Sequence, residues 1–461
     1  MMKRLCHKIE WGAAVKGLLA LGLLGAEPVA AQHRWTLREC CDYAVSHNIT
    51  IKQRENQRRQ QELQLSTAKN SRLPDLNGSA GQNFSFGRGL TAENTYTNTN
   101  TSSTSFSLGS SVPLFTGFQI PNQIKLNELN LEAATQDLEK ARNDIRMQVA
   151  QAYVQILYNM EMAEVAQRQI GIDSMQVARL QALLATGKAS EVELSQQKAT
   201  LANSRLTATQ ADNNLQLALL SLTQLLELES PEGFNIVAPS AEAAGASMGV
   251  SLAADAREAI PAPDVIYAEA FGLRPEILSE QLRVKASERS IDIAKAGNYP
   301  TLSLSGGLGS NYYQTSGFTA DNFGKQLKNN FSQYVGINLN VPIFNRFQTR
   351  NSIRSAQIDR ENQLLQLDNT KKSLYKEIQQ VYYNTVAAQA KYASSAQAVR
   401  SSADAFTLMQ AKYENGKANI TEFNESKNNY LKSESDLAQA RYEYLYQQAL
   451  IKFYRGHDLD F

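Results

Sequence analysis

The sequence predicts a mixed α+β membrane protein whose chain contains two successive copies of one structural unit. The first observation behind this prediction is a motif that occurs twice, as "VPLFTGF" from Val112 and as "VPIFNRF" from Val341. The second is a period-two alternation of apolar and polar residues before each motif, which is typical of strands with one apolar face. The third is a very long helical pattern after each motif, over residues 121–186 and 350–415.

The beginning of the chain has the pattern of a secretory signal peptide. A basic stretch (3–8) precedes the apolar "GLLALGLLG" (17–25), and Val29 and Ala31 occupy the small-residue positions of a cleavage site. The apolar stretch is shorter than the ~18 residues that a transmembrane helix needs, which disfavours a membrane anchor. We therefore expect residues 1–31 to be a signal peptide and the remainder to leave the cytoplasm.

Composition and motifs exclude several classes of function. The 461-residue chain has a net charge of +1, so we expect no nucleic-acid partner. After the signal peptide, histidine occurs at positions 33, 47 and 457, which is not a metal-ligand spacing. The sequence contains neither a P-loop nor a nucleophile elbow. We predict that the protein is not an enzyme and that it has no catalytic residues, no cofactor and no metal.

The cysteines do not form a disulfide framework. Cys6 falls within the predicted signal peptide, and Cys40 and Cys41 are adjacent to each other. We interpret this adjacent pair as two small apolar residues on the first helix.

A second landmark recurs at a constant distance from the repeated motif. "ATGKASEVELSQ" (185–196) matches "ENGKANITEFNE" (414–425), and its glycine lies 75 residues after the motif valine in both copies. A constant spacing over this distance indicates two structural repeats. The predicted domains are a first repeat at 32–229, a connector rich in Ala, Gly, Ser and Pro at 230–263, and a second repeat at 264–461.

Each repeat is expected to contain an initial helix, two strands, a long helix and a return helix. The long helices carry apolar residues, many of them small, at steps of three and four, which is coiled-coil spacing. Gly187 and Gly416 occupy the position of a helix C′ glycine, and Ser190 and Asn419 are suitable N-caps for the return helices. The initial helices are predicted at 36–72 and 264–296, the long helices at 121–186 and 350–415, and the return helices at 190–229 and 419–454.

The predicted strands have one apolar face and aromatic residues near their ends. "YVGINLNV" (334–341), "TLSLSGGLG" (301–309) and "SFSLGSSV" (105–112) all alternate in period two. The polar stretches 87–104 and 311–330 are expected to be loops between strands. This combination favours a membrane β-barrel. A soluble sheet with one solvated face shows the same alternation and stays open as an alternative.

The two copies of the opening motif are predicted to be junctions between a strand and a long helix. Pro113 and Pro342 have no N–H to donate, so we expect them to end the strand pairing. Phe115 and Phe344 are expected at the lipid boundary. Gly117 then allows the chain to turn into the helix.

These features together resemble one known family, the TolC-like outer-membrane efflux proteins. The segment "AKYENGKANITEFNESKNNYLKSESDLAQARYEYL" (411–445) is similar to the family's second periplasmic turn and return helix. "WTLRECCDYAVSHN" (35–48) resembles the start of its first helix, and the two "VP(L/I)F" motifs resemble its exits from barrel to helix. The resemblance covers nearly all of the chain after the signal peptide.

The resemblance implies a homotrimer in the bacterial outer membrane. Four strands from each chain would form a 12-stranded β-barrel, continuous with a long α-helical coiled-coil tunnel in the periplasm. Physical reasoning supports the need for partner subunits, because four strands cannot close a barrel and open sheet edges are not tolerated in lipid. The implied function is a passive exit duct of a tripartite efflux or type I secretion system. It would receive substrate from an inner-membrane pump through a periplasmic adaptor, and open by untwisting its inner helices at the tip.

Two other architectures share some of these features. A periplasmic coiled-coil structural protein without a pore is the alternative, although the alternating strands disfavour it. A stand-alone porin-like barrel has no place for helices of this length.

The resemblance also implies which residues act at the periplasmic end. Glu422 and Glu425 match an acidic ring at the constriction, and Glu193 and Tyr413 match positions that help to hold the closed state. The helix turns are expected to narrow the tunnel and to contact the adaptor. Their residues are Thr186, Gly187, Lys188, Ala189 and Ser190 in the first copy, and Asn415, Gly416, Lys417, Ala418 and Asn419 in the second.

Three questions stay open at the level of sequence. The family's closed state also uses an arginine two residues after the second turn glycine, where this chain has Ala418, and neighbouring Lys417 is the candidate substitute. The sequence specifies neither the substrate nor the class of pump.

Overall fold

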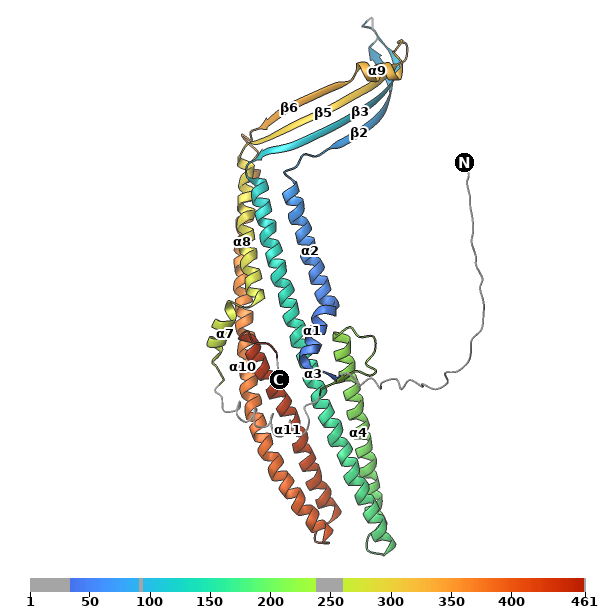
Figure 1. Cartoon of the computed structure of the whole chain (residues 1–461), viewed down its shortest axis with the longest axis vertical. Coiled ribbons are helices and arrows are strands. Elements are labelled where there is room, and N and C mark those ends of the chain that lie inside the picture. Colours follow the sequence, from blue (N-terminus) through green and yellow to red (C-terminus); the bar gives the residue numbers. More distant parts are fainter. Residues whose placement is uncertain (1–33, 91–93, 238–259, 460–461) are drawn as a thin grey trace, which may run out of the picture.

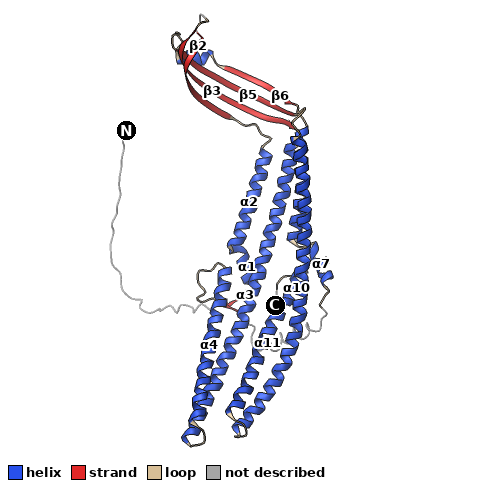
Figure 2. Cartoon of the chain, turned by 180° about the vertical axis from the view of Figure 1, so that it is seen from behind, coloured by secondary structure: helices blue, strands red, loops and turns tan. Residues whose placement is uncertain are grey.

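The computed structural model describes residues 34–90, 94–237 and 260–459. The chain is long and narrow, with a β-sheet at one end and helices along its length (Figure 1). The turns that connect the helices of its two helical hairpins lie at the other end. Figure 2 shows the same separation of strands and helices from behind. The predicted signal peptide and the middle of the predicted connector lie outside the described residues.

The two halves of the chain contain their main elements in the same order. Each has short helices, two long strands, a helix of 67 residues and a helix of 35 residues. The long and return helices lie where the sequence predicts them, with ends that differ by a few residues. The first half contains β1 (Arg34–Trp35), α1 (Leu37–His47), α2 (Ile49–Asn70), β2 (Asn77–Leu90), β3 (Tyr96–Thr116), α3 (Gln119–Ala185), α4 (Glu191–Leu225) and β4 (Asn235–Ile236). The second contains α7 (Pro263–Phe271), α8 (Pro275–Lys295), β5 (Thr301–Thr315), α9 (Phe323–Asn329), β6 (Ser332–Asn340), α10 (Gln348–Glu414) and α11 (Ile420–Tyr454).

The main sheet joins the two halves of the chain. Its order is β2–β3–β5–β6, antiparallel throughout, so that β3 of the first half pairs with β5 of the second. Leu108 lies opposite Leu308, and Leu304 lies between Val112 on β3 and Ile337 on β6. The predicted period-two alternation therefore gives the sheet one apolar face.

The two predicted polar loops contain regular structure. Most of 87–104 belongs to β2 and β3, which pair as far as Leu90 opposite Tyr96. Within 311–330, β5 continues to Thr315 and is followed by α9. The loop prediction is wrong for these parts, because a strand with polar residues on both faces has the composition of a loop. The many threonines here are β-branched and suit a strand.

The short helix α9 covers the edge of β5 beyond the end of β6. The pairing of β6 with β5 ends at Ser332. Past that point, Tyr313 N donates to Gln326 Oε1 at 2.9 Å, and Gln326 Nε2 donates to Tyr313 O at 3.0 Å. Asn330 Nδ2 donates to another carbonyl of β5 at 2.7 Å. Side-chain amides of the α9 segment thus take the place of a strand partner.

The two predicted initial helices are each broken in two. Asn48 separates α1 from α2, since its side chain accepts from Thr50 N at 2.9 Å and its Nδ2 donates to Leu225 O at 3.0 Å. In the second half, α7 ends at Phe271 and α8 begins at Pro275, a residue suited to the first turn of a helix. A single helix over 36–72 or 264–296 is therefore wrong. The first break depends on a bond to a residue far away in the chain, whereas Pro275 marks the second break in the sequence itself.

The helices form a layer that leads from the sheet to the turns. α2, α3, α8 and α10 lie side by side below the sheet, while α4 pairs with α3 and α11 with α10 as two antiparallel hairpins (Figure 1). Cys40 and Cys41 are buried in the main core, where α1 packs against α3, which confirms their interpretation as small packing residues. Across the described ranges, no helix combines the length and apolarity of a membrane span.

The two junctions between strand and helix share one backbone geometry. Phe118 before α3 (φ 69°) and Phe347 before α10 (φ 62°) both adopt the left-handed conformation. Each packs edge-on against the phenylalanine of its motif, Phe115 at 5.3 Å and Phe344 at 5.6 Å between ring centroids. At Gly117 (φ 61°) an added Cβ would lie 2.7 Å from a backbone oxygen, so glycine is required there.

The two prolines of the motif behave differently. Pro113 lies opposite Ser303 inside β3, and a bulge before Phe115 accommodates the missing N–H, so the strand continues to Thr116. The prediction that Pro113 ends the pairing is wrong. Pro342 follows the last residues of β6, as expected.

Candidate functional site at the helical turns

Both hairpins close through the same glycine turn. Gly187 (φ 71°) and Gly416 (φ 72°) adopt the left-handed conformation. Lys188 N donates to Leu183 O at 2.9 Å, and the equivalent bond from Lys417 N measures 2.8 Å. These bonds satisfy carbonyls at the ends of α3 and α10, as expected for C′ glycines.

Both return helices begin with a capping box. Ser190 Oγ accepts from Glu193 N at 3.1 Å, and the Glu193 carboxylate accepts from Ser190 N at 3.0 Å. In the second hairpin, Asn419 Oδ1 accepts from Glu422 N at 2.8 Å, and the Glu422 carboxylate accepts from Asn419 N at 2.9 Å. The two N-caps are therefore confirmed, and two of the predicted acidic residues also hold the first turn of a helix.

The structure brings Glu422 and Glu425 together in one groove. Both carboxylates are exposed in the single chain and lie one turn apart on α11. The groove, of about 500 Å³, lies between α10 and α11 and is also lined by Ser402, Met409 and Asn429. Two negative charges therefore line one open groove near the second turn.

Tyr413 lies where the ends of the two hairpins meet. Its ring stacks on Phe423, with 4.9 Å between centroids, and the guanidinium carbon of Arg179 lies 4.9 Å from the Tyr413 centroid. Arg179 Nη2 also donates to Glu414 O at 3.0 Å. Burial raises the pKa of Tyr413, while the nearby Arg179 acts in the opposite direction. The contact ties α3 of one hairpin to the end of α10 in the other.

Sequence reasoning missed Arg179. It considered Lys417 as the substitute for an absent arginine, whereas the structure places an arginine from α3 over the Tyr413 ring. The Glu193 carboxylate, which the sequence grouped with Tyr413, adds to the effect of burial and raises the pKa of that phenol. Arg179 and Glu414 are 235 positions apart in the sequence, and no local pattern marks a contact of that kind.

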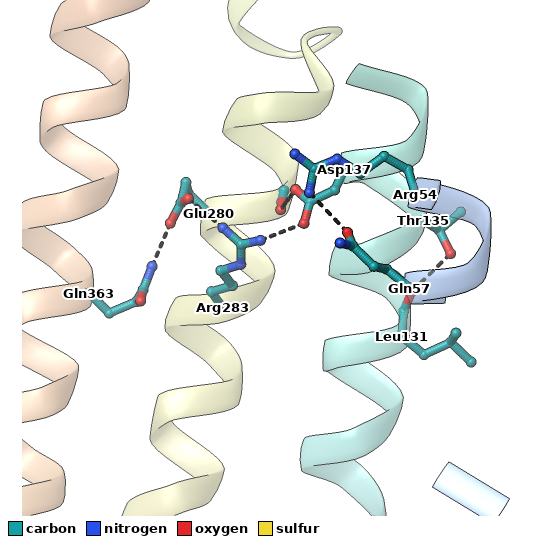
Figure 3. A network of polar contacts seen from close by, with 9 residues as sticks. Arg54, Gln57, Leu131, Thr135, Asp137, Glu280, Arg283 and Gln363 are labelled. Carbon is teal, nitrogen blue, oxygen red and sulfur yellow. Dashed lines mark hydrogen bonds and ion pairs between the residues drawn. The ribbon is translucent and has the colours of Figure 1, made fainter. Parts of the chain in front are cut away.

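A second polar cluster joins the helices nearer the sheet. Asp137 of α3 accepts from Ser279 Oγ at 2.6 Å and from Arg283 of α8, which also bonds Glu280 at 2.7 Å (Figure 3). Glu280 in turn accepts from Gln363 of α10. Polar side chains thus connect α3, α8 and α10 in the upper part of the helical layer, a network that the sequence did not reveal.

One protein family accounts for most of the chain. The model of the outer membrane efflux protein family matches residues 42–227 and 266–457. The chain belongs to the outer membrane efflux protein family. The resemblance inferred from its motifs is thereby confirmed, and family membership places the protein in the outer membrane, as predicted.

Curated relatives are similar at low identity. The chain is 26% identical over 308 residues to the fusaric acid resistance protein FusA of Burkholderia cepacia, covering 65% of this chain and 53% of FusA. It is 24% identical over 195 residues to the outer membrane protein TolC of Salmonella enteritidis, covering 42% of this chain and 40% of TolC. The chain thus spans about half the length of the curated relatives that it matches.

Solved structures of outer-membrane channels share the fold along almost the whole chain. CusC superposes with a TM-score of 0.74 at 16% identity, covering 92% of both chains. The outer membrane protein VceC of Vibrio cholerae gives a TM-score of 0.72 at 18% identity, covering 92% of this chain and 97% of VceC. The open-state MtrE channel of Neisseria gonorrhoeae gives a TM-score of 0.69 at 17% identity, covering 91% of this chain and 88% of MtrE.

Proposed function

We propose that the protein is the outer-membrane exit duct of a tripartite efflux or type I secretion system. Substrate enters at the helical turns from an inner-membrane pump and a periplasmic adaptor, and it leaves through the barrel. The observation that carries the proposal is the combination, in one chain of this family, of an amphipathic antiparallel sheet with two hairpins that end in the same glycine turn.

The proposed duct is a homotrimer. A single chain leaves β2 and β6 at the edges of its four-stranded sheet, and edges of this kind must be paired within lipid. Three copies close a 12-stranded barrel, with repeats 32–229 and 264–461 in each chain. The apolar face of the sheet is bare in the single chain, with Val335 83% exposed and Ile337 70% exposed, and it suits contact with lipid.

The proposed constriction is an acidic ring at the second turn. Three copies of Glu422 and Glu425 would surround the axis with carboxylates, which favour cations over anions. The turns Thr186–Ser190 and Asn415–Asn419 are the proposed contacts for the adaptor, since they form the end of the molecule farthest from the sheet (Figure 2). Arg179 and Tyr413 hold the two hairpin ends of one chain against each other.

Planar-bilayer recording of the detergent-purified full-length protein tests this function. We expect a protein of trimeric mass that forms cation-selective single channels. The double variant Glu422→Gln/Glu425→Gln is expected to lose most of that selectivity, whereas Glu191→Gln, an exposed acid on the other hairpin, should keep it. A folded trimer that conducts nothing would contradict the duct. A monomer soluble without detergent would instead support the periplasmic coiled-coil alternative.

A further inference from the structure

The strands of the main sheet are almost free of charged residues. β3, β5 and β6 contain no Asp, Glu, Lys or Arg, and β2 contains Arg88 alone, near the end that points away from the helices. A charge is costly within hydrocarbon, so strands of this composition suit the interior of a membrane. The charges begin on the helices directly below the sheet (Figure 1). This change in composition marks the expected position of the lipid headgroups.

The first charges beyond the sheet are mostly positive. The chain passes between the sheet and the helices at four points. At three of them the first charged residue is a cation, namely Lys125 on α3, Lys295 on α8 and Arg346 before α10. At the fourth it is Asp75, whose carboxylate accepts from Ser111 N at 2.6 Å and so already has a partner within the protein. The helical border of the sheet is therefore positive, although the whole chain has a net charge of only +1.

The aromatic residues of the first junction lie on the apolar side of the sheet. Phe115 lies opposite Leu302, which in turn lies opposite Leu339 on the apolar face. Phe118 packs against Phe115 at 5.3 Å and against Tyr299 at 6.1 Å between ring centroids, and it is 57% exposed. Exposed aromatic rings beside an apolar surface favour the boundary between hydrocarbon and headgroups.

The second junction places two arginines below an aromatic residue of the same kind. Phe347 has the position in the second motif that Phe118 has in the first, and it is also 57% exposed. The guanidinium carbon of Arg350 lies 6.0 Å from the centroid of the Phe347 ring. Arg354 follows four residues later and thus lies on the same side of α10. A line of one ring and two cations therefore runs from the junction down the helix.

These two arginines have no charged partner within the described part of the chain. Both are exposed, and the first ion pair below them on α10 joins Arg360 to Glu288 at 2.9 Å. An arginine side chain stays charged at any physiological pH and presents a planar set of N–H donors that matches phosphate oxygens. Arg350 and Arg354 are thus suited to bind phosphate groups outside the chain.

The first repeat has a cation at the matching position. Lys125 lies twelve residues after the motif proline, as Arg354 does in the second copy. The lysine pairs with Glu128 at 3.2 Å, but its side chain is still 67% exposed. Because an exposed pair of this kind is weak, the ammonium group can also interact with an anionic surface. Both strand-to-helix junctions therefore carry a basic residue at the same depth.

The direction of α3 and α10 brings these cations closer to the membrane. Both helices begin at the sheet, and the side chains of a helix tilt toward its N-terminus. Long basic side chains also extend their charged ends toward headgroups while their stems cover apolar surface. Lys295 of α8, a helix that runs toward the sheet, instead bonds Asp292 at 3.1 Å, one turn farther from the sheet.

We propose that Lys125, Arg350 and Arg354, here called the basic collar, bind the headgroups of anionic phospholipids in the leaflet of the outer membrane that faces the periplasm. The exposed phenylalanines lie above the collar in the hydrocarbon, and the cations hold the phosphates below them. The collar thereby fixes the depth of the sheet in the membrane. The inference rests on the proposed function for the position of the sheet in lipid, but it does not depend on conduction.

Native mass spectrometry of the detergent-solubilised full-length protein tests the collar. The protein is incubated with equal amounts of phosphatidylglycerol and phosphatidylcholine that have the same acyl chains, and the bound copies of each lipid are counted. Lys125→Gln/Arg350→Gln/Arg354→Gln removes three positive charges from each chain. Lys125→Arg/Arg350→Lys/Arg354→Lys changes the same side chains but keeps their charge. A trimeric mass shows that each variant is assembled.

The matched control removes the same number of charges elsewhere. Lys198, Arg205 and Lys432 are exposed residues of the return helices, far from the sheet, and none of them has an ion-pair partner among the described residues. The control variant is Lys198→Gln/Arg205→Gln/Lys432→Gln. A further sample of the wild type receives inorganic phosphate together with the lipids, which separates binding of a lipid from binding of a free anion.

We expect the wild type to retain phosphatidylglycerol in preference to phosphatidylcholine. The collar variant should lose about tenfold of this preference, since each basic residue near an anionic surface contributes about fivefold. The variant that keeps the charge should retain most of the preference, and the control variant should match the wild type. If the collar variant does not form a trimer, Arg354→Gln alone should show a loss of about fivefold.

Two results would overturn the proposal. One is a collar variant that forms a trimer and keeps the preference of the wild type. The other is displacement of phosphatidylglycerol by inorganic phosphate, which would show that the collar binds the free anion and not a membrane surface. A trimer that shows the lipid preference but conducts nothing would contradict the duct and support the collar. A conducting trimer without the preference would support the duct and contradict the collar.

Discussion

Glu193 and Glu422 occupy the same position in two copies of one capping box, and each carboxylate accepts from the backbone N–H of its N-cap residue, at 3.0 and 2.9 Å. The copies differ one turn later, where the first hairpin has uncharged Gln196 and the second has Glu425. A pair of acids three residues apart on one face therefore occurs at the second turn and not at the first, where Glu191 and Glu193 are two residues apart. Glu422 combines a structural role with a charge.

The two roles of Glu422 can be separated by substitution. Glutamine still completes a capping box, so Glu422→Gln and Glu425→Gln should lower cation selectivity to a similar extent without disturbing the turn. Glu422→Ala should also fray the start of α11, at a cost of about 1 kcal/mol, seen as faster amide exchange over residues 419–424. As a control, Glu193→Ala should fray α4 and leave selectivity unchanged. Equal exchange in the glutamine and alanine variants of Glu422 would argue against a capping role.

The contact of Arg179 with Tyr413 predicts a local stability effect. Arg179→Ala removes the cation–π contact and the bond to Glu414 O, and we expect a loss of roughly 1–2 kcal/mol in the stability of the hairpin ends. Arg179→Lys keeps the charge but should recover only part of the loss. Hydrogen exchange of residues 405–418 measures the effect, with exposed Arg205→Ala as the control.

The sequence predicted the regular features of this fold and not its long-range contacts. Helical spacing located α3, α4, α10 and α11, and Gly187 and Gly416 located their turns, because turn chemistry is local. Alternation located the apolar face of the sheet. The resemblance of residues 411–445 to a known family supplied what periodicity could not, namely the family itself.

The misses share a physical origin. Asn48 breaks the first helix through a bond to Leu225 O, and Pro113 stays inside β3 because a bulge accommodates it. Arg179 and Lys427 look like ordinary solvated charges on long helices until the partner helix is placed. Each depends on a residue far away in the chain, which the pattern around the residue itself does not contain.

The α9 segment offers a prediction at the outer end of the sheet. Gln326→Ala removes both bonds to the Tyr313 backbone at the edge of β5, and we expect the segment to detach, at a cost of about 1 kcal/mol for each bond. Limited proteolysis of the protein in outer-membrane vesicles should show faster cleavage within residues 316–331. Lys328→Ala, an exposed residue of the same helix, is the matched control. Equal cleavage of both variants would mean that Gln326 does not hold the segment.

The alkaline stability of the helical part should depend on buried tyrosine. Burial, followed by the nearby carboxylate of Glu377, raises the pKa of Tyr454 to about 12. A phenol whose pKa is higher in the folded than in the unfolded state makes folding less favourable as pH rises above the unfolded value of about 10. The ionisation of Tyr454 should therefore lower the free energy of unfolding by up to about 1.4 kcal/mol for each pH unit between 10 and 12. Tyr454→Phe should be near neutral at pH 7 and more stable than wild type at pH 11, measured by urea unfolding followed by circular dichroism.

The buried pair Asp173–Lys427 gives the largest predicted effect. Lys427→Met leaves the buried Asp173 carboxylate with only the neutral donors Ser204 and Gln197. We expect a loss of about 3–5 kcal/mol in stability. Asp173→Leu/Lys427→Met removes both charges and should recover most of that loss, because replacing a buried pair with apolar side chains is often neutral. The double variant should nevertheless assemble into a trimer that conducts, since the apolar cluster below the pair still joins the hairpins. Urea unfolding of the wild type, Lys427→Met, Asp173→Leu and the double variant gives the coupling between the two positions, and strictly additive effects would show that the charges do not act as a pair.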